Sequence, residues 1–370
     1  MRNKILLMVI LIWMSVASFC QTAREKYNFN LLSNDILQIV KETKAVGVSV
    51  ALIDNYEVVW ARGFGMNEIG TTDSVRITTL FQAASITKPV TAMAVVKKFN
   101  QGAILLTDDV DKQLISWHIP ENYLTKEAPV TVKQLLSHTS GITNKEVPMY
   151  HPNDKLPTLV QALKGESPAE NEPVVMAYYP GKTFSYSGWG YGILELLLMD
   201  TEKKNFPKVI QDEVFDPLQM SNSTFAYQLP NEKFKSIAYG HEQNKVFEHK
   251  YYVMEPLSPG GLWTTPTDLA KFIIEIQLSL IGKSNKVLTQ NSTKLMLTPV
   301  LNDYALGFTK ERRGNNVLFF GHDGQNYGYI CSMLGSVENG RGVVIMTNSD
   351  NGWKAINKIK KLVGRKYWGF

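Results

Sequence analysis

Hydrophobic and polar positions along the chain predict strands near both ends and helices between them. Near the start, the mostly apolar segments Gly47 to Ile53 and Val58 to Gly65 are separated by turn residues, which predicts a hairpin. Near the other end, four apolar segments predict further strands: Ala305 to Phe308, Val317 to Phe320, Tyr329 to Gly335 and Gly342 to Thr347. Helical and loop patterns dominate from about residue 91 to residue 229. We therefore predict an α/β (α+β) fold, in which both chain ends form one antiparallel sheet flanked by helices, with a mainly helical lobe inserted at about residues 90–255.

The first twenty residues have the pattern of a secretory signal peptide. Arg2 and Lys4 precede an unbroken apolar run from Ile5 to Met14, and small residues follow. Ten apolar residues are too few for a permanent membrane anchor, which needs about twenty. We predict cleavage after Cys20, which leaves residues 21–370 as one exported unit, periplasmic or secreted. A lipid-modified Cys20 is an alternative, although the bulky Phe19 before it fits that alternative poorly.

Composition narrows the class of protein. The chain of 370 residues is 44% hydrophobic and 20% charged, as soluble globular proteins are, so disordered and fibrous classes are excluded. The formal charge of +5 falls to +3 without Arg2 and Lys4, too little to indicate nucleic-acid binding. The exported unit keeps one cysteine, Cys331, in an apolar strand pattern, which predicts a buried small hydrophobe and no intrachain disulfide.

Basic residues gather near the C-terminus at helical spacing with apolar ones between them. This pattern favours the solvated face of a helix over a membrane-surface or anion-binding patch. The basic residues are Lys354, Lys358, Lys360, Lys361, Arg365 and Lys366.

A serine and a lysine three residues apart come just before a helical pattern. Pro89 cannot lie deep inside that helix, so the helix begins close to Ser85, and Ser85 and Lys88 project from the same face of its first turn. Free backbone amides and the positive end of the helix dipole favour negative charge there. A nucleophilic serine needs a nearby base and donors for an oxyanion, and this position can supply part of each. The four-residue pattern alone is weak.

Two glycine-rich segments could complete such a site. The first runs from Pro180 to Gly192 and contains Tyr186-Ser187-Gly188 before an apolar helical run; by itself it is typical of a helix entry. The second runs from Phe320 to Tyr329 and contains His322-Asp323-Gly324-Gln325; by itself it is typical of a turn.

Taken together, the three segments resemble the serine β-lactamase and penicillin-binding protein superfamily, and most of all its class C β-lactamase, D-alanyl carboxypeptidase and esterase branch. Ser85-x-x-Lys88, Tyr186-Ser187 and His322-x-Gly324 follow the superfamily's order, and the likeness extends from about residue 40 to residue 350. Other stretches are also similar: Val130 to Ile142, Gly260 to Leu269 and Tyr304 to Phe308.

The resemblance implies a β-lactamase/transpeptidase-like fold and a role for each residue. Ser85 is the implied acylated nucleophile, Lys88 and Tyr186 hold and move its proton, and the backbone amides of Ser85 and Gln325 form the oxyanion hole, with Gln325 on a strand that His322-x-Gly324 opens. A tyrosine acts as a base only if nearby cations favour its phenolate or if the proton moves in concert. Lys88 and His322 are the available cations, and many relatives have lysine at position 322, so activity is expected to fall where His322 changes its protonation.

One position departs from the superfamily's pattern. Relatives that cleave β-lactams or peptidoglycan peptides usually carry asparagine two residues after the tyrosine, where this chain has Gly188. Loss of that amide costs about 1 to 3 kcal/mol if a substrate group is left unpaired. We therefore expect an ester or a small peptide to be a better substrate than a β-lactam.

Other classes of site fit the sequence less well. No G-x-S-x-G nucleophile elbow is present, and His241-Glu242 does not extend to a zinc-binding H-E-x-x-H motif. We interpret His138 as a structural, hydrogen-bonded histidine. We expect a monomeric serine hydrolase with a small-molecule or peptide substrate, no cofactor, no metal, no nucleic-acid partner and no stable membrane insertion. The alternative is a non-catalytic penicillin-binding or peptidoglycan-sensing module with the same fold.

Overall fold

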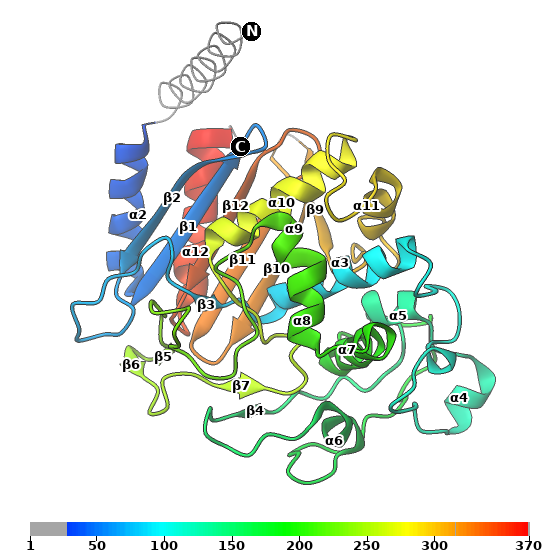
Figure 1. The fold of residues 1–370 in the computed structure, drawn as a ribbon. Coiled ribbons are helices and arrows are strands. Elements are labelled where there is room, and N and C mark those ends of the chain that lie inside the picture. The colour runs from blue at the N-terminus through cyan, green and yellow to red at the C-terminus, as the bar shows by residue number, and fades with distance from the viewer. Residues whose placement is uncertain (1–27, 315, 369–370) are drawn as a thin grey trace, which may run out of the picture.

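The structure is a computed structural model that describes residues 28–314 and 316–368, and it confirms the predicted α/β fold (Figure 1). A six-stranded antiparallel sheet has the order β2-β1-β12-β11-β10-β9, so strands from both ends of the chain lie side by side. Its strands are β1 (Gly47–Asp54), β2 (Glu57–Gly65), β9 (Thr309–Arg313), β10 (Val317–Asn326), β11 (Tyr329–Ser336) and β12 (Gly342–Thr347).

Helices cover both faces of the sheet at its centre, so β1, β11 and β12 are almost wholly buried, while the edge strands β2 and β9 are partly exposed. Successive side chains of a strand point to opposite faces. On β11, Ile330 and Leu334 pack in one core with helices α2 (Phe29–Thr43) and α12 (Gly352–Val363). Cys331 and Met333 pack on the other face, in the core that contains α10 (Pro266–Leu280). Cys331 is buried, as predicted, and burial raises the pKa of its thiol.

A largely helical part lies beside the sheet, below it in the view of Figure 1. Its two long helices are α3 (Thr87–Asn100) and α7 (Gly188–Glu202), and both are largely buried. The shorter helices of this part are α4 (Tyr123–Glu127), α5 (Val132–Leu136), α6 (Leu159–Lys164) and α8 (Phe206–Ile210), while α9 (Asp216–Leu218) and α11 (Gln290–Met296) lie level with the sheet in this view. Short strand pairs join the loops: β3 (Phe81–Gln82) with β8 (Trp263–Thr264), β4 (Met149–Tyr150) with β7 (Val253–Met254), and β5 (His241–Glu242) with β6 (Lys245–Val246).

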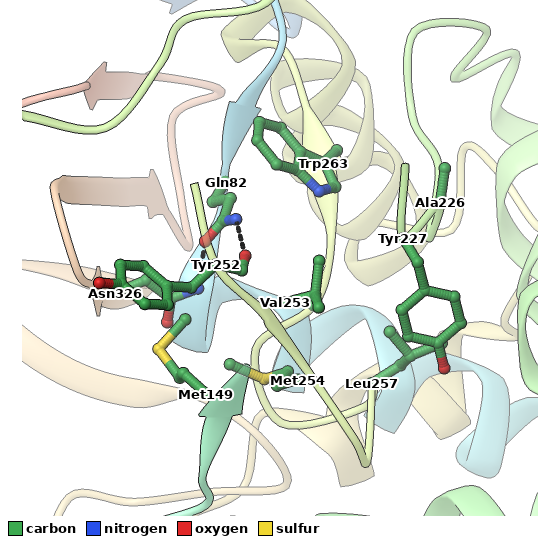
Figure 2. A pocket seen from close by; sticks show the side chains of 11 residues that line it. Gln82, Met149, Ala226, Tyr227, Tyr252, Val253, Met254, Leu257, Trp263 and Asn326 are labelled. Atoms are coloured by element: carbon green, nitrogen blue, oxygen red, sulfur yellow. Dashed lines mark hydrogen bonds between the residues drawn. The ribbon is translucent and has the colours of Figure 1, made fainter. Parts of the chain in front are cut away.

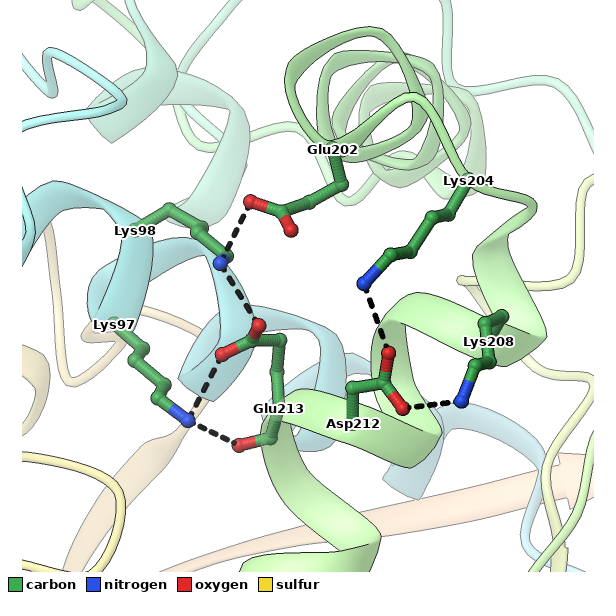
Figure 3. A network of polar contacts seen from close by, with 7 residues as sticks. All are labelled: Lys97, Lys98, Glu202, Lys204, Lys208, Asp212 and Glu213. Carbon is green, nitrogen blue, oxygen red and sulfur yellow. Dashed lines mark hydrogen bonds and ion pairs between the residues drawn. The ribbon is translucent and has the colours of Figure 1, made fainter.

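Ion pairs fasten the end of α3 to neighbouring helices (Figure 3). Lys98 Nζ lies 2.6 Å from Glu202 Oε1 on α7 and 2.8 Å from Glu213 Oε1 on the π-helical turn η3 (Gln211–Phe215). Lys97 Nζ lies 2.8 Å from the other carboxylate oxygen of Glu213. Burial opposes ionisation of Glu213, but the two lysines dominate and lower its pKa. Because Lys98 is only 5% exposed, these contacts are shielded from solvent and hold α3 in position.

Two details of the predicted strands are wrong. Ala305 to Phe308 is a buried turn, in which Gly307 has a φ of 85° and packs against α3; the strand β9 begins at Thr309. The residues there are apolar because they lie in a buried loop, not because they form a strand. His322 does not open a strand: it lies in the second half of β10, and the chain turns back only at Tyr327 and Gly328.

The C-terminal basic residues lie mostly on the exposed side of α12 and the turn that follows it. Lys358 and Lys366 pair with Glu42 and Asp35 of α2, and Lys360 pairs with Asp323. Within residues 28–314 and 316–368, no helix combines the length and the apolar character needed to cross a bilayer. The predicted signal peptide lies outside the described residues.

Candidate active site

Ser85 lies in a short 3₁₀ turn, η1 (Ala84–Ile86), that leads directly into α3. The residue before it, Ala84, has a φ of 48°, a left-handed conformation that costs a residue with a side chain roughly 1–2 kcal/mol. The Thr87 hydroxyl donates to the Ala84 carbonyl at 2.6 Å and stabilises this turn. The Ser85 side chain is half-buried, so it remains open to a substrate.

Lys88 follows one helical turn later and is 2% exposed. Its Nζ lies 3.0 Å from Ser85 Oγ and 2.8 Å from the carbonyl oxygen of Pro259. Burial lowers the pKa of Lys88 from 10.5 to about 7, because desolvation disfavours the charged amine. At neutral pH, a large fraction of the protein therefore carries a neutral amine that can accept the proton of Ser85.

Tyr186 lies in the loop before α7 and completes the group around Ser85. Its hydroxyl hydrogen-bonds with Ser85, and its ring centre lies 4.8 Å from Lys88 Nζ. Part of the ring reaches solvent, but burial of the hydroxyl raises the pKa of Tyr186, and the hydrogen bond with Ser85 offsets this only in part. Tyr186 is therefore a neutral phenol at physiological pH, suited to relaying a proton rather than to acting as a phenolate base.

His322 lies on the edge of β10 beside these residues, with its ring centre 6.2 Å from that of Tyr186. Its Nε2 is 3.2 Å from the Tyr304 hydroxyl, and its Nδ1 is 2.5 Å from the Asp323 carbonyl oxygen. Burial and the charge of Lys88 lower the pKa of His322 to about 4. His322 therefore supplies no fixed positive charge at neutral pH, and together with the raised pKa of Tyr186 this favours concerted movement of the Tyr186 proton over a phenolate.

Gly324 brings the edge of β10 into contact with the nucleophile turn. A Cβ atom at position 324 would lie 2.3 Å from the Ala83 carbonyl oxygen and 3.2 Å from the Ser85 amide nitrogen, so only glycine fits. The Gln325 side chain points to the other face of the sheet, where its Oε1 accepts a hydrogen bond from Trp353. Only the backbone of Gln325 can therefore act beside Ser85, as an oxyanion hole requires.

Gly188 is the first residue of α7 and faces Val147 and Pro259. A Cβ atom there would lie 2.8 Å from Val147 Cγ2. Val147 thus occupies part of the space that a larger side chain at position 188 would need.

The sequence did not reveal the second hydrogen-bond partner of Lys88 Nζ, which is the Pro259 carbonyl oxygen. The Pro259 carbonyl belongs to a turn whose preceding residue, Ser258, is anchored three times. The Ser258 amide donates to Glu195 of α7 at 2.7 Å, its hydroxyl donates to Tyr191, and its carbonyl accepts from Thr91 of α3. These contacts form only in the folded chain, so spacing along the sequence gives no sign of them.

The chain matches the family model described as Beta-lactamase over residues 32–362. It is 26% identical to "Protein flp" of Staphylococcus aureus strain N315 over 312 residues, which cover 82% of this chain. The chain spans 59% of the length of that curated relative.

Solved structures show the same fold at low sequence identity. A penicillin-binding protein homologue from Pyrococcus abyssi has a TM-score of 0.73 and 23% identity, over 91% of this chain and 78% of that one. A D-amino acid amidase from Ochrobactrum anthropi SV3, complexed with L-phenylalanine amide, has a TM-score of 0.72 and 22% identity, over 90% and 98%. A β-lactamase/D-alanine carboxypeptidase from Yersinia pestis has a TM-score of 0.68 and 22% identity, over 91% and 99%.

The fold, the arrangement around Ser85 and the extent of the family match agree with one another. The class C branch expected from the sequence stays a prediction. The chain belongs to the beta-lactamase family.

Proposed function

We propose that this protein is an exported serine hydrolase that forms an acyl-enzyme at Ser85 and acts on small esters or on amides and peptides of D-amino acids. One observation carries the proposal: the amine of Lys88, buried and with a pKa lowered to about 7, lies 3.0 Å from a half-buried serine hydroxyl. A neutral amine at that distance can take the hydroxyl proton during attack.

The reaction would proceed in two halves. Ser85 Oγ attacks the substrate carbonyl carbon while its proton passes to Lys88 Nζ, directly or through the Tyr186 hydroxyl. The backbone amides of Ser85 and Gln325 stabilise the oxyanion. The C–O or C–N bond then breaks, and the proton passes from Lys88 or Tyr186 to the leaving alcohol or amine. Water attacks the acyl-enzyme by the same proton route and releases the acid and free Ser85.

A small hollow of about 10 Å³, room for about one water molecule, lies beside the site and is too small to receive a substrate side chain (Figure 2). Three of its lining segments adjoin the site: Gln82 precedes Ser85 by three residues, Asn326 follows Gln325, and Gly261 follows the Pro259 turn. Met149 and Met254, paired across β4 and β7, also line it.

We expect a β-lactam to be a poorer substrate than an ester or a D-amino-acid amide or peptide. Gly188 offers no amide to pair with a substrate's amide group, which disfavours β-lactams by about 1 to 3 kcal/mol if that group stays unpaired. Two of the similar structures are a D-amino acid amidase and a β-lactamase/D-alanine carboxypeptidase, and the amidase and carboxypeptidase activities fit the amide and peptide side of the proposal.

The test compares purified wild-type protein with Ser85→Ala on four substrates: p-nitrophenyl acetate, nitrocefin, a D-alanyl dipeptide, and D-phenylalanine amide beside its L enantiomer. We expect turnover of the ester and of D-configured amides or peptides, slower nitrocefin hydrolysis, and loss of all activity in Ser85→Ala. Absence of turnover on every substrate would favour the non-catalytic penicillin-binding or peptidoglycan-sensing module.

A further inference from the structure

His138 lies just beyond helix α5 and contacts the segment that carries Tyr186 on both sides. The His138 carbonyl oxygen accepts the Ser185 amide at 2.8 Å, and His138 Nδ1 accepts the Ser187 amide at 3.1 Å. Between these two contacts, the imidazole lies against the Tyr186 ring, with ring centres 4.1 Å apart. One residue therefore fixes the backbone before and after Tyr186 and also contacts its side chain.

Packing alone does not explain a histidine at this position. His138 is 1% exposed, and its Nε2 has no hydrogen-bond partner among the described residues. A buried polar atom without a partner costs about 1–3 kcal/mol, and an aliphatic or phenyl side chain would fill the space without that cost. The backbone is also unusual, since His138 has a φ of 57°, in the left-handed region. Such features in the interior call for a specific reason.

The hydrogen bonds define which form of the imidazole is present. Nδ1 accepts a hydrogen bond from the Ser187 amide, so it must carry a lone pair, and the ring proton of the neutral form is on Nε2. Burial lowers the pKa of His138 well below its usual value, and the charge of Lys88 and then that of His322 act in the same direction. The imidazole therefore stays neutral at physiological pH, so that it keeps its acceptor without adding charge beside Lys88.

We propose that His138 is a positioning residue for the acylation step, whose neutral Nδ1 and ring hold the Tyr186 hydroxyl against Ser85. The inference rests on the proposed function, because it assigns a role in that reaction. The Tyr186 ring is 40% exposed, and the His138 ring lies nearer to it, at 4.1 Å, than the rings of His322 at 6.2 Å and Tyr304 at 6.5 Å. A ring that can rotate toward solvent would leave the proton relay, and a displacement of about 1 Å can cost on the order of 100-fold in rate.

A matched pair of variants tests the acceptor. His138→Asn places an amide oxygen where Nδ1 lies and tolerates the left-handed backbone, while His138→Gln carries its amide one atom further from the backbone. Single-turnover acylation by a p-nitrophenyl ester is measured for both. We expect His138→Asn to keep a rate within about fivefold of wild type and His138→Gln to lose 10- to 100-fold, with KM changed far less than kcat. Equal rates in the two variants would overturn the proposal.

A double-mutant cycle with Tyr186→Phe separates positioning from general stability. If His138 acts through the Tyr186 hydroxyl, His138→Gln lowers the acylation rate in wild-type protein but has little effect when Tyr186 is already phenylalanine. Equal fold losses in both backgrounds would overturn the role. Glu213→Gln, which removes a distant ion pair, serves as the destabilised control and should keep the wild-type rate per folded molecule. If the wild-type protein does not hydrolyse the ester, the proposed function fails rather than the role of His138. The ester assay shows this before any variant is compared.

Discussion

The pH dependence of acylation should follow the protonation of Lys88, with a midpoint near pH 7. The ordinary pKa of 10.5 falls to about 7 on burial, a change that corresponds to about 5 kcal/mol disfavouring the charged amine. An unperturbed lysine is neutral in roughly one molecule in 3,000 at pH 7, whereas about half of the buried amines are neutral there. The single-turnover acylation rate should therefore rise about tenfold from pH 6 to pH 8 and level off above pH 8.

The assay is stopped-flow release of p-nitrophenol between pH 5 and pH 9, corrected for the ionisation of the product. His322→Gln serves as the control, because His322 is another titratable base at the site and its pKa is lowered to about 4. The midpoint should stay near pH 7 in that variant. A flat profile between pH 6 and pH 8, or a midpoint that disappears with His322, would refute the role of Lys88 as the base.

For substitutions at three further residues, the structure predicts whether stability rises or falls. Gly188→Asn should destabilise the protein by about 1–3 kcal/mol, because its Cβ overlaps Val147. Adding Val147→Ala should recover the thermal stability and raise the ratio of nitrocefin to ester turnover, which thermal melting and kinetic assays of both variants measure. Glu213→Gln should cost about 1–3 kcal/mol at pH 7 in urea unfolding, since Lys98 loses a shielded partner, and the difference should shrink as acid protonates wild-type Glu213, whose pKa is lowered. Burial raises the pKa of Glu255 from 4.5 to about 7, so its ionisation weakens the fold as pH rises through that window; Glu255→Gln should raise Tm at pH 8 and leave it unchanged near pH 4, and a Tm gain at both pH values would contradict this.

The layout of the fold could be predicted because its signals are local. The strands at each chain end carry mostly apolar residues that face two covered sides of one sheet, and β1 and β12 lie where the pattern predicts them. The prediction failed at Ala305 to Phe308, because an apolar loop buried under α3 has the same composition as a strand.

Part of the candidate site could also be predicted from the sequence, because the signal for it is local. The spacing of Ser85 and Lys88 places them on one helix face, which is a local property. Tyr186 and His322 could be assigned only through resemblance. The Pro259 carbonyl, the contacts of His138 and the burial that shifts the pKa of Lys88 arise from tertiary packing, and a backbone carbonyl leaves no trace in side-chain identity.

Acyl transfer to Ser85 is the central event of the proposed reaction, and mass spectrometry after brief acid quenching would observe it directly. Wild-type protein is incubated with the p-nitrophenyl ester, a fluorescent penicillin or a fluorophosphonate, then digested and mapped. We predict one added acyl or phosphonyl group per chain, on the peptide that contains Ser85, with none in Ser85→Ala. Absence of an adduct with all three reagents, or continued turnover by Ser85→Ala, would contradict the assignment of Ser85 as the nucleophile.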